Sequence, residues 1–277
     1  MDALQPSIDP EADNQAVIQA CIDDAHARGG GTVVLPNGRC PIAGPLELRS
    51  NVTLRGTGMI TTILAPITAP GTPLLVATEL LAGATVEDLT VAGLAGAPDA
   101  DATSDDDAQA RPPAINGAAI DLVAGASFCF LRRLRLVDLP GGALRLTGGP
   151  VDHVYLEQIV VEGCAGDGIV VDPSGESTAV FLTEVSVRLF GRGTSSGSAG
   201  VRTRGRTFIS QLHVQPVGRD ACGLRLEAGS DHTVASNLFV GTAGGEAWSA
   251  EPGVTDVEVE ALLVRDLLDV RQEKVFP

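Results

Sequence analysis

The chain has 277 residues, of which 44% are hydrophobic, so it is long enough to bury a full core and too apolar to be largely disordered. Its 19 basic and 35 acidic residues give a net charge of −16, which argues against a nucleic-acid-binding protein because such proteins need a basic face. No apolar run approaches the roughly 20 residues of a membrane span, and no secretion signal is visible at the start. We therefore expect one cytoplasmic domain over residues 1–277, with neither a nucleic-acid nor a membrane partner.

Residues 10–28 carry the one convincing helix signal. Asp9 can cap this helix, Pro10 suits its first turn, and the triplet Gly29–Gly31 ends it. An apolar face is formed by Ile18, Cys21, Ile22 and Ala25.

From residue 84 onward, one pattern of alternating apolar residues around a polar or small residue repeats along the chain. Its seven copies begin at Ala84, Cys129, Val154, Val180, Thr207, Thr233 and Val257. From residue 129 the steps between copies are 25, 26, 27, 26 and 24 residues, and an acidic insert at 93–117 lengthens the first step to 45. Period-2 alternation on both sides of the polar position predicts two short strands joined at a bend. The polar residues at the bend are Asp88, Arg133, Gln158, Glu184, Gln211 and Asn237.

A third strand follows each copy, usually after a glycine, at 119–123, 143–147, 168–172, 200–204 and 223–227. Three strands per coil of about 25 residues predict an all-β, right-handed parallel β-helix with three sheets and about seven to eight coils. Because a solenoid needs its open end covered, helix 10–28 is the expected N-terminal cap, and residues 265–277 form a C-terminal tail.

Three N-terminal segments resemble those of pectate-lyase-like right-handed β-helix proteins. They are DNQAVIQACIDDA at 13–25, GGTVVLPNG at 30–38 and SNVTLRGTG at 50–58. The resemblance implies this fold over essentially the whole chain. That superfamily includes pectate and alginate lyases, polygalacturonases, uronate epimerases and phage tailspikes. Polygalacturonase signatures such as Gly-His-Gly are absent, so that hydrolase chemistry is not implied.

The outward positions of the third strands predict a charged patch, because alternate residues of a strand point in opposite directions. One column holds Asp121, Arg145, Val170, Arg202, Arg225 and Trp248, and the next holds Val123, Thr147, Asp172, Arg204, Glu227 and Ala250. Neighbours in a column are about 4.8 Å apart. Arginines there could hold an anionic or enolising oxygen while a carboxylate moves a proton. Four arginines face two carboxylates, Asp172 and Glu227, which leaves positive charge for an anionic ligand.

We therefore predict a catalytic group of Arg202, Asp172, Arg204, Arg225 and Glu227. Substrate-binding positions are Arg145, Asp121, Trp248 beside Arg225, and His153, which follows the Arg145 strand by a short turn. The related lyases use this same face. The alternatives are a solvated ladder of ion pairs for the charged residues, plain packing for Trp248 and a surface position for His153.

A second outward column contains Phe130, Tyr155, Phe181 and Phe208. Solenoid faces rarely leave such a stripe in water, so we expect the tail or a second copy of the chain to cover it, the latter giving a homo-oligomer. An apolar ligand cleft is a third option. The loops at 93–117, 188–199 and 215–222 are expected to wall the charged face.

The first functional hypothesis is a cofactor-independent acid–base enzyme, a lyase, isomerase or cyclase, acting on a small oxygenated metabolite in biosynthesis. The missing secretion signal and the 3% aromatic content favour a small substrate over a sugar polymer. The alternative, implied by the resemblance, is a polysaccharide or uronate lyase or epimerase, with arginine as base and calcium at acidic residues such as 99–107. A third possibility is a non-catalytic binding or structural β-helix. Five scattered cysteines without a CxxC pair predict neither disulfides nor a zinc site.

Overall fold

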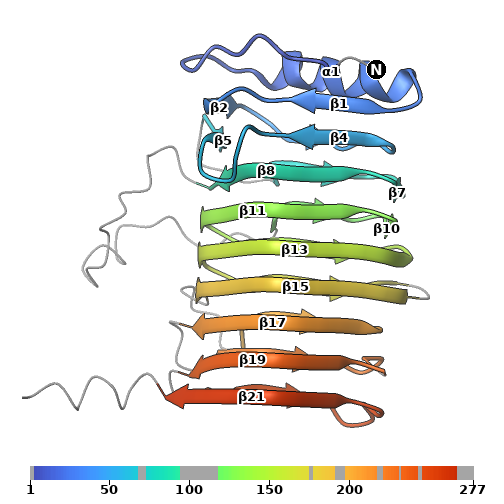
Figure 1. Ribbon diagram of the computed structural model, residues 1–277, viewed down its shortest axis with the longest axis vertical. Helices are drawn as coiled ribbons and strands as arrows, with labels where there is room; N and C mark the ends of the chain where they lie inside the picture. Colours follow the sequence, from blue (N-terminus) through green and yellow to red (C-terminus); the bar gives the residue numbers. More distant parts are fainter. Residues whose placement is uncertain are drawn as a thin grey trace, which may run out of the picture.

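The protein is a solenoid of parallel strands that winds along one axis below a single helix (Figure 1). This computed structural model describes residues 3–67, 73–93, 118–174, 177–190, 197–216, 221–230, 232–242 and 245–266. All strand pairs within those ranges are parallel, and successive coils lie side by side in two sheets. The predicted all-β parallel β-helix with an N-terminal helix is confirmed.

Sheet A contains thirteen strands. They are β1 Gly31–Val34, β2 Gly38–Ile42, β4 Val52–Arg55, β5 Thr62–Pro66, β7 Leu81–Ala82, β8 Thr85–Ala92, β10 Ala126–Ser127, β11 Phe130–Leu139, β13 Val151–Cys164, β15 Ser177–Phe190, β17 Thr207–Pro216, β19 Val234–Thr242 and β21 Glu258–Asp266.

Sheet B contains eight strands in the spatial order β20-β18-β16-β14-β12-β9-β6-β3. They are β3 Leu46–Glu47, β6 Leu75–Ala77, β9 Ala118–Leu122, β12 Gly142–Thr147, β14 Ile169–Asp172, β16 Ala199–Thr203, β18 Cys222–Leu226 and β20 Trp248–Ala250. Five of these strands, β9, β12, β14, β16 and β18, match the third strands that the sequence predicted.

The bend between the first two strands of each coil is made by a single residue in the left-handed region. The six polar bend residues of the repeat have φ between 51° and 59°, as at Arg133 and Gln211, and Ala261 takes this position in the last coil. Because one such residue turns the chain without ending the hydrogen-bonded ladder, both faces belong to one long bent sheet. Two continuous sheets therefore carry the three predicted faces.

The strand register confirms the repeat. Thr85 pairs with Phe130, Phe130 with Tyr155, and Tyr155 with Phe181, and the series continues through Phe208 and Val234 to Glu258. Because β8 pairs directly with β11, the 45-residue step of the repeat separates two neighbouring strands of sheet A.

The glycine that precedes many sheet-B strands is explained by close packing between the two sheets. A Cβ at Gly200 would lie 2.5 Å from Val214, and one at Gly223 would lie 2.5 Å from Val240. Gly168 has the same relationship to Val187 at 2.4 Å. A side chain at these three glycines would press on the facing valine, although the equivalent position holds alanine in other coils, at Ala119, Ala143 and Ala247.

Helix α1 (Gln15–Ala27) covers the N-terminal end, as predicted, and buries Ile18, Ile22 and Ala25. Its start is five residues later than the expected position 10, and Cys21 is only half-buried. The reason lies before the helix. The Asn14 amide donates to the carbonyl oxygens of Asp9 (2.7 Å) and Pro41 (3.2 Å), so the preceding residues form a turn tied to β2. No helix among the described residues is long and apolar enough to cross a membrane.

Most of the insert, at 94–117, and the end of the tail, at 267–277, lie outside the described residues. So do 191–196 and 217–220 in the other two predicted wall loops. The predictions that rest on these segments, including the calcium alternative at 99–107, remain predictions.

Candidate active site on sheet B

The predicted charged patch exists on the outward face of sheet B. The inward positions pack in the core, with Leu144, Ile169, Val201 and Leu224 almost fully buried. The alternate positions form the expected outward column, because Arg145 pairs with Val170, Val170 with Arg202, and Arg202 with Arg225. Strand alternation in β12, β14, β16 and β18 therefore places the arginines on one surface.

Arg202 is the most strongly held of these side chains. Its guanidinium lies 3.1 Å from the Asp167 carboxylate and 2.9 Å from that of Glu227, and it donates to the Gly197 carbonyl oxygen at 3.2 Å. Burial alone would lower the pKa of Arg202, but the two carboxylates outweigh burial and raise that pKa above its ordinary value. Arg202 therefore stays protonated and fixed in direction.

Glu227 connects two arginines. In addition to Arg202, it lies 3.7 Å from Arg204, which also pairs with Asp172 at 3.3 Å. The Glu227 side chain is only 13% exposed, whereas that of Asp172 is 41% exposed. Asp172 is thus the more open of the two carboxylates and the better placed to contact a ligand.

Arg225 differs from the other three arginines. Its guanidinium donates to the carbonyl oxygen of Gly197 at 2.7 Å, and no carboxylate within the described ranges pairs with it. Gly197 has φ of +100°, a conformation that favours glycine, so the shared acceptor of Arg202 and Arg225 depends on that residue. Arg225 is the guanidinium best able to take an anionic ligand.

The expected surplus of positive charge on this face is smaller than the sequence suggested. Arg145 is paired with Asp121, whose side chain is only 5% exposed, and Asp167 provides a further carboxylate. Four carboxylates therefore accompany four arginines, and the estimate based on Asp172 and Glu227 alone was wrong. Most charged side chains of this face therefore form ion pairs between strands, as the alternative interpretation expected, and Arg225 is the exception.

Trp248 does not lie beside Arg225 as predicted. It pairs with Leu224, and Ser249 pairs with Arg225, so the predicted alignment of the last coil was wrong by one residue. Because side chains alternate along a strand, a shift of one residue moves Trp248 from the outward to the inward column. The indole remains 39% exposed in this last coil.

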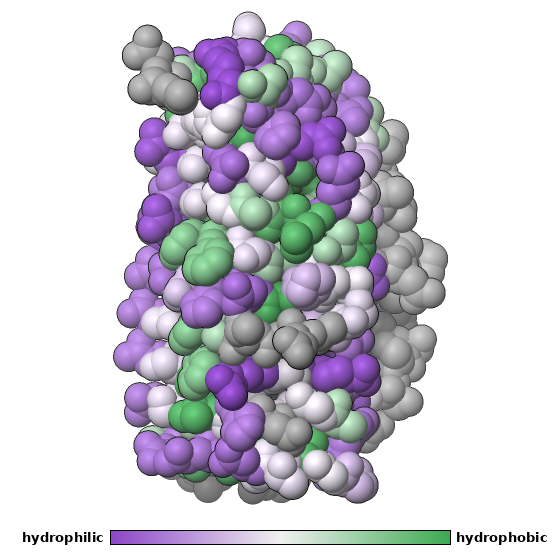
Figure 2. Space-filling view, turned by 90° about the vertical axis from the view of Figure 1, so that its right-hand side faces the viewer, coloured by the Kyte–Doolittle hydropathy of each residue, from purple (hydrophilic) through white to green (hydrophobic). Residues whose placement is uncertain are grey.

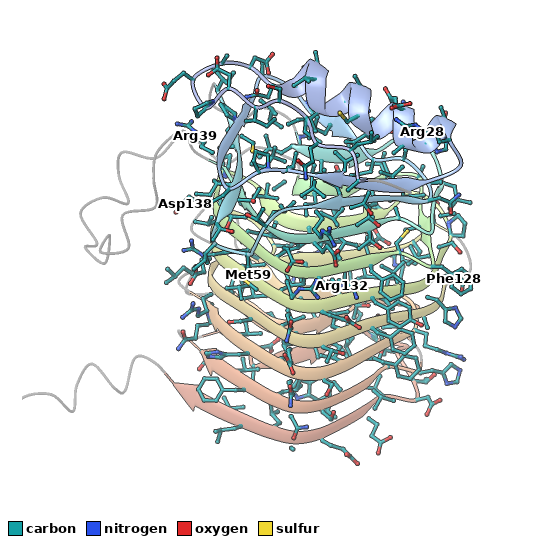
Figure 3. All side chains as sticks on the ribbon, turned by 45° about the horizontal axis from the view of Figure 1, so that its top comes forward. Arg28, Arg39, Met59, Phe128, Arg132 and Asp138 are labelled. Carbon is teal, nitrogen blue, oxygen red and sulfur yellow. The ribbon has the colours of Figure 1, made fainter. Side chains whose placement is uncertain are left out.

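His153 also does not join the patch. It lies on β13 in sheet A, where its ring stacks on Phe128 with 5.2 Å between centroids and its Nδ1 lies 2.6 Å from an Asp152 carboxylate oxygen. The short turn after β12 carries the chain away from sheet B, so the proximity of His153 to Arg145 in sequence has no counterpart in space. Phe128 is labelled at the edge of sheet A in Figure 3.

The four aromatic residues of the second outward column form a stacked ladder on sheet A. Ring centroids are 4.7 Å apart for Phe130 and Tyr155, 4.9 Å for Tyr155 and Phe181, and 5.1 Å for Phe181 and Phe208. All four side chains are partly buried, which confirms their outward direction. The rings bury part of each other's surface. On the side shown in Figure 2, apolar surface lies in separate patches among hydrophilic residues.

Sequence reasoning missed Asp167 and Gly197. Asp167 stands directly before the glycine that starts a sheet-B strand, a position that could have marked it as a turn residue facing the patch. Gly197 contributes only a backbone oxygen, for which a sequence carries no signal. The described residues contain no group of three or more His, Cys, Asp or Glu side chains arranged to hold a metal ion.

Short local similarity links the chain to mannuronan C5-epimerases and an alginate lyase. Mannuronan C5-epimerase AlgE6 of Azotobacter vinelandii is 48% identical over 63 residues, which is 20% of this chain and 7% of that enzyme. Alginate lyase 7 of the same organism is 41% identical over 63 residues, with the same two shares. The matched stretch is thus a small part of each relative, and no family model matches the chain.

Similarity over the whole chain is confined to the fold. The surface protein and adhesin PfbA of Streptococcus pneumoniae superposes with a TM-score of 0.60 at 12% identity, covering 96% of this chain and 86% of PfbA. The chain is a parallel β-helix. Its fold is the one that the resemblance to pectate-lyase-like proteins implied.

Proposed function

We propose that the protein is a polysaccharide-modifying enzyme that epimerises or cleaves a uronate-containing polymer at the outward face of sheet B. The observation that carries the proposal is the arrangement around Arg225, a guanidinium without a carboxylate partner among the described residues, on the same face as the open carboxylate of Asp172. The local similarity to mannuronan C5-epimerases and an alginate lyase supplies the substrate class.

Both reactions begin with the same proton transfer. A base removes the proton at C5 of the sugar, and the electron pair of that C–H bond moves into the adjacent carboxyl group. A guanidinium bound to that carboxyl group stabilises the added charge. In an epimerase, a different proton is then added to the opposite face of C5 by an acid on that side of the sugar, which exchanges with solvent. In a lyase, the bond between C4 and its oxygen breaks instead, a C4–C5 double bond forms, and the departing oxygen takes a proton.

Different residues of the site perform carboxylate binding and proton transfer in this proposal. Arg225 binds the uronate carboxylate, and Asp172, the more exposed carboxylate, exchanges the proton. Arg202 is an unsuitable base because Asp167 and Glu227 raise its pKa and keep it charged. We therefore assign the base to a carboxylate rather than to arginine, in contrast to the alternative raised from the sequence.

The test is an assay on polymannuronate in D2O. Epimerisation introduces deuterium at C5, which NMR detects, and cleavage produces an unsaturated sugar that absorbs in the ultraviolet. We expect Asp172→Asn and Arg225→Ala to reduce kcat by roughly 10²-fold or more, the usual effect of removing a positioned acid–base or oxyanion group. If both variants keep full activity, this face is not the active site.

Arg188→Ala is a matched control. Arg188 is an outward-pointing arginine on β15 of sheet A, paired with Glu162, and its side chain is 41% exposed. Because it lies on the other sheet, its loss should leave kcat unchanged while removing one comparable ion pair.

Two other functions remain distinguishable by the same assay. The comparisons give no support to a small oxygenated metabolite as substrate, and a non-catalytic β-helix would bind the polymer without deuterium incorporation or cleavage. A pulldown with immobilised polymannuronate run beside the activity assay separates binding from catalysis.

A further inference from the structure

The two ends of the solenoid are covered very differently. Helix α1 lies over the N-terminal coil, whereas β20 and β21 are the last strands of their sheets at the opposite end (Figure 1). In the described ranges, neither strand has a partner on its outer edge. An uncovered strand edge presents unpaired N–H and C=O groups and is a template for another strand.

The apolar side chains of this last coil confirm that its end is open. Trp248 pairs with the fully buried Leu224, yet it is 39% exposed. Val264 pairs with the fully buried Val240, yet it is 47% exposed. Side chains that point into the core therefore meet solvent here, because no described coil follows. Terminal coils of a solenoid need a cover for this reason.

A second copy of the chain is a poor cover. The last coil carries Glu251, Asp256, Glu258 and Glu260, all exposed, and the whole chain has a net charge of −16. Glu260 and Asp256 are close enough to Glu258 to raise its pKa, Glu260 through a hydrogen bond and charge and Asp256 through charge alone. Two such ends brought together would repel each other.

The eleven residues that follow β21 are rich in apolar residues and, unlike the last coil, have no excess of acidic side chains. Residues 267–277 contain five apolar side chains, at Leu267, Leu268, Val270, Val275 and Phe276. They also contain Arg271 and Lys274, the only lysine of the chain, and these two charges balance those of Asp269 and Glu273. Eleven extended residues reach about 36 Å, and β21 has nine residues, so the segment is long enough to cross the end once. Its covalent attachment at Asp266 gives it a high effective concentration there.

We propose that residues 267–277 fold back over the open C-terminal end of the β-helix and cover Trp248 and the apolar residues of the last coil. This cap is independent of the proposed catalytic function. In this proposal the tail covers the end of the solenoid. It therefore does not cover the aromatic ladder of sheet A, for which the sequence analysis had also considered it.

Trp248 is the only tryptophan and so reports directly on the cap. Its fluorescence is compared in the full chain and in a chain ending at Asp266. We expect acrylamide to quench the full chain at least about twofold more weakly than the shortened chain, because the proposed cap shields Trp248, which is 39% exposed at the end of the last described coil. Its emission should also lie at shorter wavelength. Equal quenching in the two chains would overturn the proposal.

Point variants of the full chain test the same proposal even if the truncated chain misfolds. Leu267→Ser combined with Leu268→Ser should increase quenching while circular dichroism retains the strand signal. Ile60→Ser, which changes an apolar residue 73% exposed in the first coils, should not. If the protection of Trp248 disappears on dilution, a second copy is the cover and the proposal is wrong. If the double-serine variant quenches like the unaltered chain, the tail does not lie on Trp248.

Discussion

Asp167 and Arg202 are 35 residues apart in the sequence, yet the Asp167 carboxylate lies 3.1 Å from the guanidinium of Arg202. The same carboxylate accepts a hydrogen bond from the backbone N–H of Ala199 at 2.7 Å. Asp167 therefore fixes both Arg202 and the start of β16, just after Gly197, whose carbonyl oxygen Arg202 and Arg225 share. We regard Asp167 as a positioning residue of the candidate site.

Asp167→Asn should therefore reduce kcat on the uronate polymer by about tenfold or more, because small displacements of a positioned group are costly. Steady-state kinetics that separate kcat from KM provide the measurement. Asp121→Asn, which removes the partner of Arg145 on the same sheet, is the control and should have the smaller effect on kcat. If both variants lose the same amount of kcat, in proportion to their loss of melting temperature, Asp167 has only a structural role.

The bend residues should be sensitive to β-branched substitution. Gln211 has φ of 59°, a conformation that costs a non-glycine residue about 1–2 kcal/mol and a β-branched residue more. We expect Gln211→Val to lower the free energy of unfolding in urea by at least about 1 kcal/mol, and Gln211→Gly to raise it. The neighbouring Ser210 pairs within the sheet ladder, so Ser210→Val should have little effect.

The aromatic ladder predicts a graded loss of stability. Phe181 stacks on both Tyr155 and Phe208, whereas Phe208 stacks only on Phe181 among the described residues. Each stacked pair contributes about 0.5–1.5 kcal/mol beyond burial, so Phe181→Ala should destabilise the protein by about that much more than Phe208→Ala. Urea unfolding of the two variants tests this. Light scattering of the same samples tests whether the ladder is a homo-oligomer interface, which remains a prediction.

Low pH should lower the free energy of unfolding by protonating Asp88, one of the polar bend residues. A hydrogen bond from Arg133, 2.6 Å long, outweighs burial and lowers the pKa of Asp88. A lowered folded pKa gives stability that is complete above the ordinary carboxyl value of about 3.9 and is lost as the pH falls through the folded value. Asp88→Asn should therefore flatten the pH dependence of urea unfolding in that acidic window. An unchanged slope would contradict the prediction.

The five free cysteines should differ sharply in reactivity. Burial raises the pKa of Cys40 to about 11 and that of Cys164 to about 12, and it raises those of Cys129 and Cys222 as well. Since thiolates are the reactive form, only half-buried Cys21 on helix α1 should react quickly with a thiol reagent in the folded protein. Cys21→Ser should remove this fast phase, and a second fast thiol would show that a buried coil opens.

The sequence by itself determined the β-helix and, except at Trp248 in the last coil, its register. Strand alternation, a repeat of about 25 residues and a polar residue at each bend follow from local chemistry, and stacking identical coils leaves only one alignment, as the pairing of Phe130 with Tyr155 shows. For the same reason the outward column of Arg145, Arg202 and Arg225 was predictable. The late start of helix α1 was not, because distant contacts of Asn14 with Pro41 decide it.

Only the tertiary structure showed which charged side chains form ion pairs and which predicted residues lie outside the site. Asp167 reaches Arg202 from a turn, Gly197 offers a backbone oxygen, and His153 joins Phe128 on the other sheet. The one-residue shift at Trp248 arises in the last described coil, where no further described strand fixes the register. Alternation determines the direction of a side chain within a strand, but the partner of that side chain depends on how turns and coil ends are placed in space.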